Sequence, residues 1–343
     1  MKLIKLMKKQ TEQLKKIDLS YMDITKKSIT CPVCNEDKNS IVSSGISRGG
    51  IDLTYVICHK CTHIYMKYVP SNLAYTKFYE SGDYRRLTGE HNDTKGIIED
   101  PSKFSVKYSH GVRLYEQYLK GILAKGDVVF DFGCGDGAWL YGLRLISECD
   151  IDGNEPSLSD LEFIRTKMGV KIFEGLIEDC AEEIKKKYKG KVKLTIVSGS
   201  LQHMLDPMKC LSLAYEILSN DGYLYICNKN IFVHYISPKS PYPRKFAALR
   251  TVDHPHYFHE DSYRYMVEKS GFEIISFNNK SSVRAEHMEI FAKKILVGKN
   301  PNNLTGYNKI LKKIRFQELK VSIYWSLPLR AYRWVKRKFL YNK

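Results

Sequence analysis

The most constraining feature of the sequence is an apolar strand that runs directly into a loop of closely spaced glycines. Residues 128–132 (VVFDF) lead into residues 133–137 (GCGDG), and a helix is expected from about Ala138. Glycines let the chain turn sharply and approach a ligand, and the amides that begin a helix point toward that ligand. The segment therefore predicts a strand–loop–helix unit that binds a cofactor where the strand ends.

From about Ser105 onward, apolar strand patterns alternate with helical stretches. A helix is expected over 105–124. Strands are expected over 128–132, 149–155, 170–175, 193–199, 222–228, 272–278 and 291–298. This alternation predicts an α/β fold with a mainly parallel, Rossmann-like sheet and helices on both faces. No long helix separates the last two strands, so we expect an antiparallel end to the sheet.

Two carboxylates near the glycine loop bear on which cofactor it binds. Gly133, Gly135 and Ala138 also satisfy the dinucleotide pattern GxGxxG/A, so a nicotinamide cofactor is the first alternative. Asp131 lies two residues before the first glycine, where it would repel a pyrophosphate but could face an ammonium group, as in S-adenosylmethionine (SAM). Glu155 ends the next strand and can accept both ribose hydroxyls of either cofactor. The position of Asp131 therefore favours SAM, whereas Glu155 is compatible with both SAM and a nicotinamide cofactor.

The order of motifs resembles that of class I SAM-dependent methyltransferases. The motifs, over about residues 105–295, are DFGCGDG, GNEPS, IVSGSLQHMLDP, ILSNDGYLYICNKN and DHPHYFHEDSYRYMVEKSGF. The preceding CPVC, CHKC and IYMKYVPSNLAYTKFYESGDY segments are similar to a subgroup whose zinc ribbon precedes the methyltransferase domain. That subgroup is often associated with the modification of cell-surface sugars or specialised metabolites. The resemblance implies methyl transfer from SAM to a small-molecule or glycan acceptor, such as a sugar or a surface polysaccharide.

The resemblance also implies roles for individual residues. Asp131 and the loop glycines would hold the methionine end of SAM, Glu155 the ribose, and Pro156 the adenine. The expected cofactor-binding set is Asp131, Gly133, Cys134, Gly135, Gly137, Glu155, Pro156, Ile177, Glu178, Ser198 and Ser200. Two positions depart from the family pattern: Leu176 replaces an Asp expected at the adenine edge, and Gln202 replaces a Glu.

Histidines supply the candidate catalytic groups, because imidazole is the natural base near neutral pH. His203 matches the family histidine that follows the fourth strand. It is either the base or a histidine that hydrogen-bonds to its own loop. His256 matches a histidine that lines or orients the pocket. Asp253, His254, His256, His259 and Asp261 could form a metal cluster, but their HxHxxH spacing is unlike that of zinc proteases, and we do not expect a second metal site.

A separate metal site is predicted near the N-terminus. Cys31 and Cys34 form one CxxC pair, and Cys58 and Cys61 form a second pair after a spacer of 23 residues. Four thiolates satisfy the tetrahedral preference of zinc and leave no position open for catalysis. The site is therefore expected to hold one structural zinc ion, with iron as the main competitor. Nine cysteines in total, an odd number, indicate a reducing cytoplasm and not a disulfide framework.

Charge is concentrated at the two ends of the chain. The formal net charge is +17, of which residues 1–30 contribute +5 and residues 301–343 contribute +10. The start lacks the apolar core of a secretory signal, and no apolar run approaches the ~20 residues of a membrane span. Residues 306–340 are expected to form two helices split by Pro328. Their basic, amphipathic character suits an anionic membrane surface or an acidic protein partner, with packing against the core as the alternative.

The sequence therefore divides into five expected parts. They are a basic N-terminal helix over 1–27, a zinc ribbon over 28–68, a connector or lid over 69–104, the SAM-binding domain over 105–300 and a basic amphipathic helical tail over 301–343. The expected location is cytoplasmic, with peripheral attachment to the inner face of the membrane as an option. Two other functions remain open: an RNA methyltransferase, disfavoured by the nearly neutral residues 31–300, and a SAM-binding scaffold without turnover.

Overall fold

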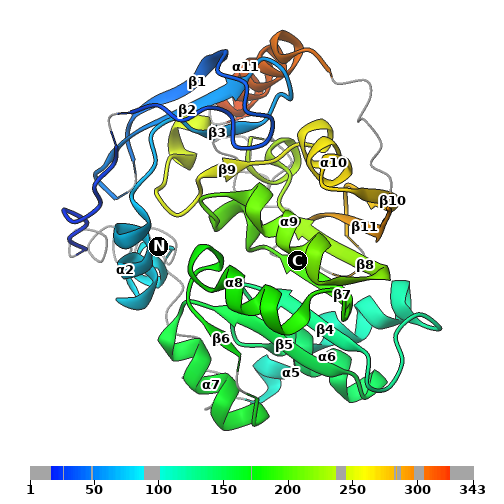
Figure 1. Ribbon diagram of the computed structural model, residues 1–343. Helices are drawn as coiled ribbons and strands as arrows, with labels where there is room; N and C mark the ends of the chain where they lie inside the picture. The colour runs from blue at the N-terminus through cyan, green and yellow to red at the C-terminus, as the bar shows by residue number, and fades with distance from the viewer. Residues whose placement is uncertain are drawn as a thin grey trace, which may run out of the picture.

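Two β-sheets organise the protein, as the computed structural model in Figure 1 shows. The structure describes residues 17–25, 27–47, 49–88, 101–170, 172–236, 245–281, 283, 287–296 and 305–324. The expected helix over 1–27 falls mostly outside these ranges, and residues 17–25 are not helical. No helix within the described residues is long and apolar enough to cross a membrane.

The larger sheet has seven strands in the order β10-β11-β8-β7-β4-β5-β6. Their bounds are β4 Val128–Phe132, β5 Asp150–Glu155, β6 Phe173–Glu174, β7 Val192–Ser198, β8 Leu218–Asn228, β10 Phe272–Asn278 and β11 Met288–Lys294. Strands β4 to β8 pair in parallel, and β11 is antiparallel to both β8 and β10. The expected Rossmann-like sheet and its antiparallel end are both confirmed.

Helices cover both faces of this sheet because side chains alternate along each buried strand. Val129 points into a cluster with α5 (Pro101–Leu114), α6 (Ala138–Ser147) and α7 (Leu158–Met168). Phe130 points the opposite way, into a cluster with α8 (Ile177–Tyr188), α9 (Pro207–Ile217) and α10 (Glu260–Lys269). A π-helical turn, η1 (Tyr115–Leu119), continues α5 toward β4.

Helices α5 and α6 approach each other through glycines. A Cβ atom at Gly142 would lie 2.1 Å from the carbonyl oxygen of Tyr108, and one at Gly111 would lie 2.2 Å from that of Trp139. Both distances are far below van der Waals contact. The backbones can therefore pack this closely only because neither position carries a side chain, and this packing fixes the direction in which α6 leaves the glycine loop.

The smaller sheet combines segments from distant parts of the sequence. It has the order β1-β2-β3-β9, with β1 Asn39–Ile46, β2 Asp52–Cys58, β3 Ile64–Met66 and β9 His256–Tyr257. Strand β9 pairs antiparallel with β3, placing Tyr65 opposite His256. A segment from within the expected SAM-binding domain is thus part of the sheet that follows the first CxxC pair, and sequence alone did not reveal this pairing.

Further helices border the smaller sheet. Within residues 69–88 of the connector, the structure has two short helices, α2 (Asn72–Glu80) and α3 (Asp83–Thr88). Helix α11 (Tyr307–Tyr324) packs across the sheet through Ile310 and Ile314, and Figure 1 shows it at the edge of the molecule beside β1 and β2. The second expected C-terminal helix, beyond Pro328, lies outside the described residues.

Candidate active site

The glycine loop between β4 and α6 adopts a backbone conformation that side chains resist. Gly133, Gly135 and Gly137 have φ values of 69°, 58° and 71°, in the left-handed region that glycine adopts most readily. A Cβ atom at Gly133 would lie 2.8 Å from the Cβ atom of Ser200, whereas one at Gly135 would meet nothing within 4 Å. The loop therefore packs tightly on one side and is open at Gly135, which faces a cavity.

Glu155, at the end of β5, is tied to this loop. Its Oε2 accepts from the Gly135 amide (2.8 Å), and its Oε1 accepts from the Ser157 amide (2.9 Å). Burial and the nearby Asp160 carboxylate raise the pKa of Glu155 to about 7, although the two amide hydrogen bonds oppose the shift. The buried carboxylate therefore changes charge near neutral pH, within reach of any ligand in the cavity.

The cavity, of about 530 Å³, collects most of the residues that the sequence singled out. Those that line it are Asp131, Gly133, Cys134, Gly135, Glu155, Pro156, Ile177, Glu178, Ser198, Ser200 and His203. Gly137 does not line the cavity; it precedes α6, and a Cβ atom there would lie 2.9 Å from Met168 Sδ. Ser198 Oγ is buried and has no hydrogen-bond partner among the described residues, so it is available to a ligand. The open loop, the Glu155 carboxylate and this hydroxyl fit an adenosyl amino acid such as SAM.

The connector helices form part of the cavity wall. Tyr79 of α2 and Tyr84 of α3 both line the cavity. The Tyr84 ring lies 5.3 Å from the His203 ring in an edge-on arrangement. Tyr75 of α2 donates from its hydroxyl to the carbonyl oxygen of His203 (2.7 Å). The connector therefore contacts the segment that carries the candidate base.

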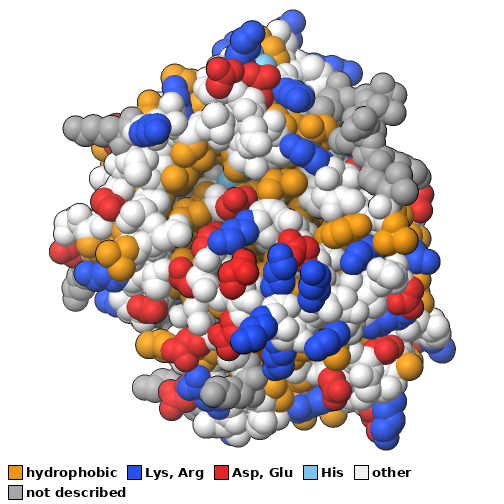
Figure 2. Space-filling model, in the orientation of Figure 1, with side chains coloured by type: hydrophobic (Ala, Val, Ile, Leu, Met, Phe, Trp, Pro, Cys, Tyr) orange, Lys and Arg blue, Asp and Glu red, His pale blue; other side chains and the backbone are white. Residues whose placement is uncertain are grey.

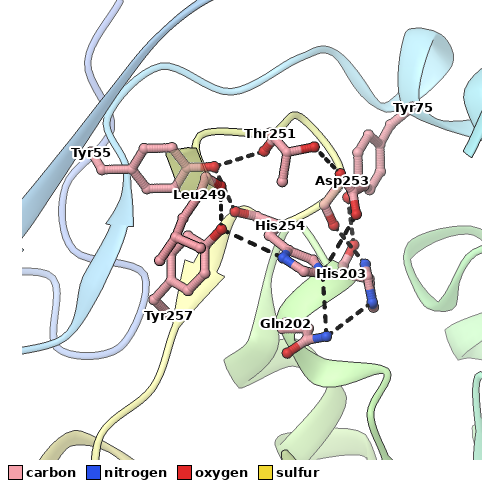
Figure 3. A network of polar contacts seen from close by, with 9 residues as sticks. All are labelled: Tyr55, Tyr75, Gln202, His203, Leu249, Thr251, Asp253, His254 and Tyr257. Atoms are coloured by element: carbon pink, nitrogen blue, oxygen red, sulfur yellow. Dashed lines mark hydrogen bonds and ion pairs between the residues drawn. The ribbon is translucent and has the colours of Figure 1, made fainter. Parts of the chain in front are cut away.

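A polar network surrounds His203, which lies in a short turn after β7 (Figure 3). His203 Nδ1 donates to the backbone oxygen of Asp253 (2.6 Å), because a carbonyl can only accept. Its Nε2 lies 3.2 Å from Gln202 Nε2, which is also 3.3 Å from His254 Nε2. Burial lowers the pKa of His254, although Asp253 opposes that shift. Gln202 therefore lies between the imidazoles of His203 and His254.

His256, by contrast, is not among the residues that line the cavity. Its Nδ1 lies 3.0 Å from His63 Nε2, and its Nε2 lies 3.4 Å from the Leu205 carbonyl oxygen. Burial lowers the pKa of His256 to about 4, so the ring is neutral near pH 7. Pairing of β9 with β3 places this histidine between the two sheets, two residues after its cavity-lining neighbour His254.

Several cavity residues were not anticipated from the sequence as site residues. They are Lys107, His110, Trp139, Lys229, Tyr235, Thr251, Tyr257 and His287. Lys107 forms an ion pair with Asp136 of the glycine loop (2.7 Å), and the His110 and Trp139 rings stack with centroids 5.3 Å apart. In this part of the cavity wall, the sequence had pointed only to Asp253 and His254, as members of a candidate metal cluster with His256, His259 and Asp261. The structure brings Asp253 and His254 together with His203 instead, while His259 Nε2 contacts the Thr62 carbonyl oxygen (2.9 Å).

The four cysteines of the CxxC pairs form a separate buried cluster. Cys31 Sγ lies 3.4 Å from Cys61 Sγ, and Cys34 Sγ lies 3.4 Å from Cys58 Sγ. These distances exceed the ~2.05 Å of a disulfide, and all four sulfur atoms lie within 4.8 Å of one another. The arrangement could hold one metal ion, at a site that does not overlap the residues lining the cavity.

Part of the chain is similar to known proteins. Residues 108–277 match the family described as Methyltransferase domain. A SAM-dependent methyltransferase from Archaeoglobus fulgidus is 19% identical and has a TM-score of 0.40, over 54% of this chain and 92% of that one. One from Aquifex aeolicus is 18% identical, with a TM-score of 0.40, over 57% and 99%. No curated protein matches the chain.

The Rossmann-like part of the chain, which holds the glycine loop and Glu155, carries a methyltransferase domain over residues 108–277. The protein is a SAM-dependent methyltransferase.

Proposed function

We propose that the protein transfers the methyl group of SAM to a small-molecule or glycan acceptor. The observation that carries this proposal is the continuity of one cavity, which joins the glycine loop to a wall formed by Gln202, His203, His254 and Tyr235. Its volume of about 530 Å³ falls within the range of small-molecule sites, ~300–1,000 Å³. The aromatic and polar wall suits a hydroxylated acceptor such as a sugar, free or within a surface polysaccharide.

In this proposal SAM lies along the carboxyl ends of β4, β5 and β7. Asp131, the loop glycines and Cys134 contact the methionine end, and Glu155 accepts from the ribose hydroxyls. Pro156, Ile177 and Glu178 flank the adenine, and Ser198 and Ser200 lie beneath the sulfonium. The support is that every one of these residues except Gly137 lines the cavity. Gly137 acts through the backbone turn that begins α6.

His203 is the proposed base. Its Nδ1–H donates to Asp253, so the lone pair is on Nε2, directed at the side chain of Gln202. The acceptor hydroxyl gives its proton to this nitrogen, and its oxygen attacks the methyl carbon. The carbon–sulfur bond breaks with its electron pair remaining on sulfur, which yields S-adenosylhomocysteine. His256 is proposed to orient this turn from outside the cavity, through the Leu205 carbonyl oxygen.

The test is transfer of labelled methyl from SAM to fractionated small molecules, glycans and RNA. We expect label in the glycan or small-molecule fraction from the full chain. Label confined to RNA would overturn the acceptor proposal, and SAM binding without any transfer would favour the scaffold. On the face in Figure 2, Lys and Arg are interspersed with Asp and Glu, which does not favour a continuous nucleic-acid surface.

We also propose that Cys31, Cys34, Cys58 and Cys61 bind one structural zinc ion. All four side chains are buried, and tetrahedral thiolate coordination at ~2.3 Å per bond requires sulfur atoms that lie only a few ångströms apart, as they do. Elemental analysis of the purified chain should give one zinc per molecule. Iron in its place, or no metal, would contradict the proposal.

The C-terminal helix is proposed to place the enzyme at an anionic membrane surface on the cytoplasmic side. Phe316, Leu319 and Ile323 of α11 are each more than half exposed on one side of the helix. Lys312, Arg315 and Lys320 lie between and beside them in the sequence. Flotation with phosphatidylserine vesicles tests this: the triple variant Phe316→Ser, Leu319→Ser, Ile323→Ser should bind less than the unaltered chain. Equal binding would point to packing or an acidic partner instead.

A further inference from the structure

A cluster of potential metal ligands occupies one wall of the cavity, apart from the four cysteines. His203 follows β7, and Asp253 and His254 lie in the turn before β9, so the two sheets together bring them into contact. Their nearest ligand atoms all lie within 4.8 Å of one another. All three residues line the cavity that joins the glycine loop to the acceptor wall.

The His203 imidazole is oriented as metal-binding histidines usually are. His203 donates from Nδ1 to the Asp253 carbonyl oxygen (2.6 Å), which fixes the ring and leaves the lone pair on Nε2. Gln202 Nε2 lies 3.2 Å from His203 Nε2 and 3.3 Å from His254 Nε2. Figure 3 shows the Gln202 side chain reaching both rings. Both Nε2 atoms therefore lie near the Gln202 amide nitrogen, which a bound cation would displace from this position.

Asp253 supplies a buried negative charge to the same region. The residue is 2% exposed. One carboxylate oxygen accepts from the Thr251 hydroxyl, and the other lies 3.4 Å from His254 Nε2. Across the described parts of the chain, no lysine or arginine forms an ion pair with this carboxylate. Buried carboxylates are generally paired with a cation or coordinated to a metal, so a bound cation would supply the compensating charge.

We propose that His203 Nε2, His254 Nε2 and one Asp253 carboxylate oxygen bind a single divalent transition-metal cation in the cavity. Two imidazoles and one carboxylate are donors that suit such ions and leave coordination positions open. Two nitrogens on one ion lie at most about 4.2 Å apart, and each of the three residues offers a ligand atom within 4.8 Å of the other two, so the side chains must move closer together to share an ion.

The cation and the acceptor proton compete for the same lone pair of His203. In the metal-loaded protein, His203 is a ligand, and an acceptor oxygen on an open position would ionise more readily next to the cation. The proposal concerns metal binding and does not depend on methyl transfer, because binding can be measured without turnover.

Manganese titration of the full chain, purified with the four-cysteine site loaded with zinc, tests the proposal. Mn²⁺ prefers oxygen and nitrogen donors and is the weakest binder in its series, so it does not displace zinc from thiolates. Loss of the electron paramagnetic resonance signal of free Mn²⁺ should indicate one bound ion per chain. Asp253→Asn and His254→Gln should each weaken binding at least tenfold.

His287→Gln is the matched control, because His287 is an imidazole residue that lines the same cavity but lies outside the cluster. It should leave Mn²⁺ affinity unchanged. S-adenosylhomocysteine binding checks that each variant is folded. If Asp253→Asn does not fold, the Mn²⁺ affinity of His254→Gln tests the proposal by itself. Absence of Mn²⁺ binding by the unaltered chain, or equal binding by His254→Gln, would overturn the proposal.

Discussion

The affinity for SAM should depend on pH through Glu155. Burial places the pKa of this carboxyl at about 7 in the ligand-free protein, well above its ordinary value of 4.5. Ribose hydroxyls donate to the ionised form, so SAM binding favours loss of the proton and strengthens as pH rises through 7.

The size of the effect follows from the ionised fraction. With a pKa of about 7, the ionised fraction falls from about nine-tenths at pH 8 to about one-tenth at pH 6, which weakens binding about tenfold, or about 1.4 kcal/mol. Isothermal titration calorimetry at the two pH values measures this change. The amino group of SAM also titrates, at about pH 8. The Glu155→Gln variant lacks the carboxyl, so its pH dependence reports the contribution of this amino group alone. Equal pH dependence in the unaltered chain and in Glu155→Gln would exclude Glu155 as its source.

Three further outcomes are expected. His203→Ala should lower kcat by ~10²-fold or more, as the loss of a general base does, with SAM affinity within twofold of the unaltered chain; an unchanged kcat would remove His203 from catalysis. Cys34→Ser should release the metal and lower the melting temperature, because a structural zinc ion contributes directly to folding; full zinc content in this variant would argue against the four-cysteine site. Gly142→Ala should destabilise the protein by about 1–3 kcal/mol in urea unfolding, since its Cβ atom would lie 2.1 Å from the Tyr108 carbonyl oxygen; a smaller loss than that of Gly306→Ala, whose Cβ atom would meet nothing within 4 Å, would contradict the packing argument.

The larger sheet was predictable because its signals are local. Each strand is an apolar run bounded by turn residues, and the glycine loop specifies the turn between β4 and α6 by itself. The carboxyl ends of parallel strands meet at one edge, so Asp131, Glu155 and Ser198 could be assigned to one site before their contacts were known. The structure gathers these three around the same cavity.

The wall opposite the loop was harder to predict because it depends on long-range pairing. Strand β9 has two residues, too few for a periodic pattern, and it pairs with β3 nearly two hundred positions earlier. That pairing places His256 between the sheets and His254 at the cavity, a distinction that the DHPH sequence does not contain. Gln202, noted only as a departure from a family pattern, proves to contact both His203 and His254.

SAM is expected to bind at the open side of the glycine loop, beside Gly135. A Cβ atom at Gly135 would meet no protein atom within 4 Å, so a side chain there would project into the cavity. Calorimetric titration of the full chain with SAM should show one site per chain. In Gly135→Val, with an unchanged circular dichroism spectrum, affinity should fall at least tenfold. Equal affinity in the two proteins would show that SAM binds elsewhere, and no binding by the unaltered chain would show that it is not the cofactor.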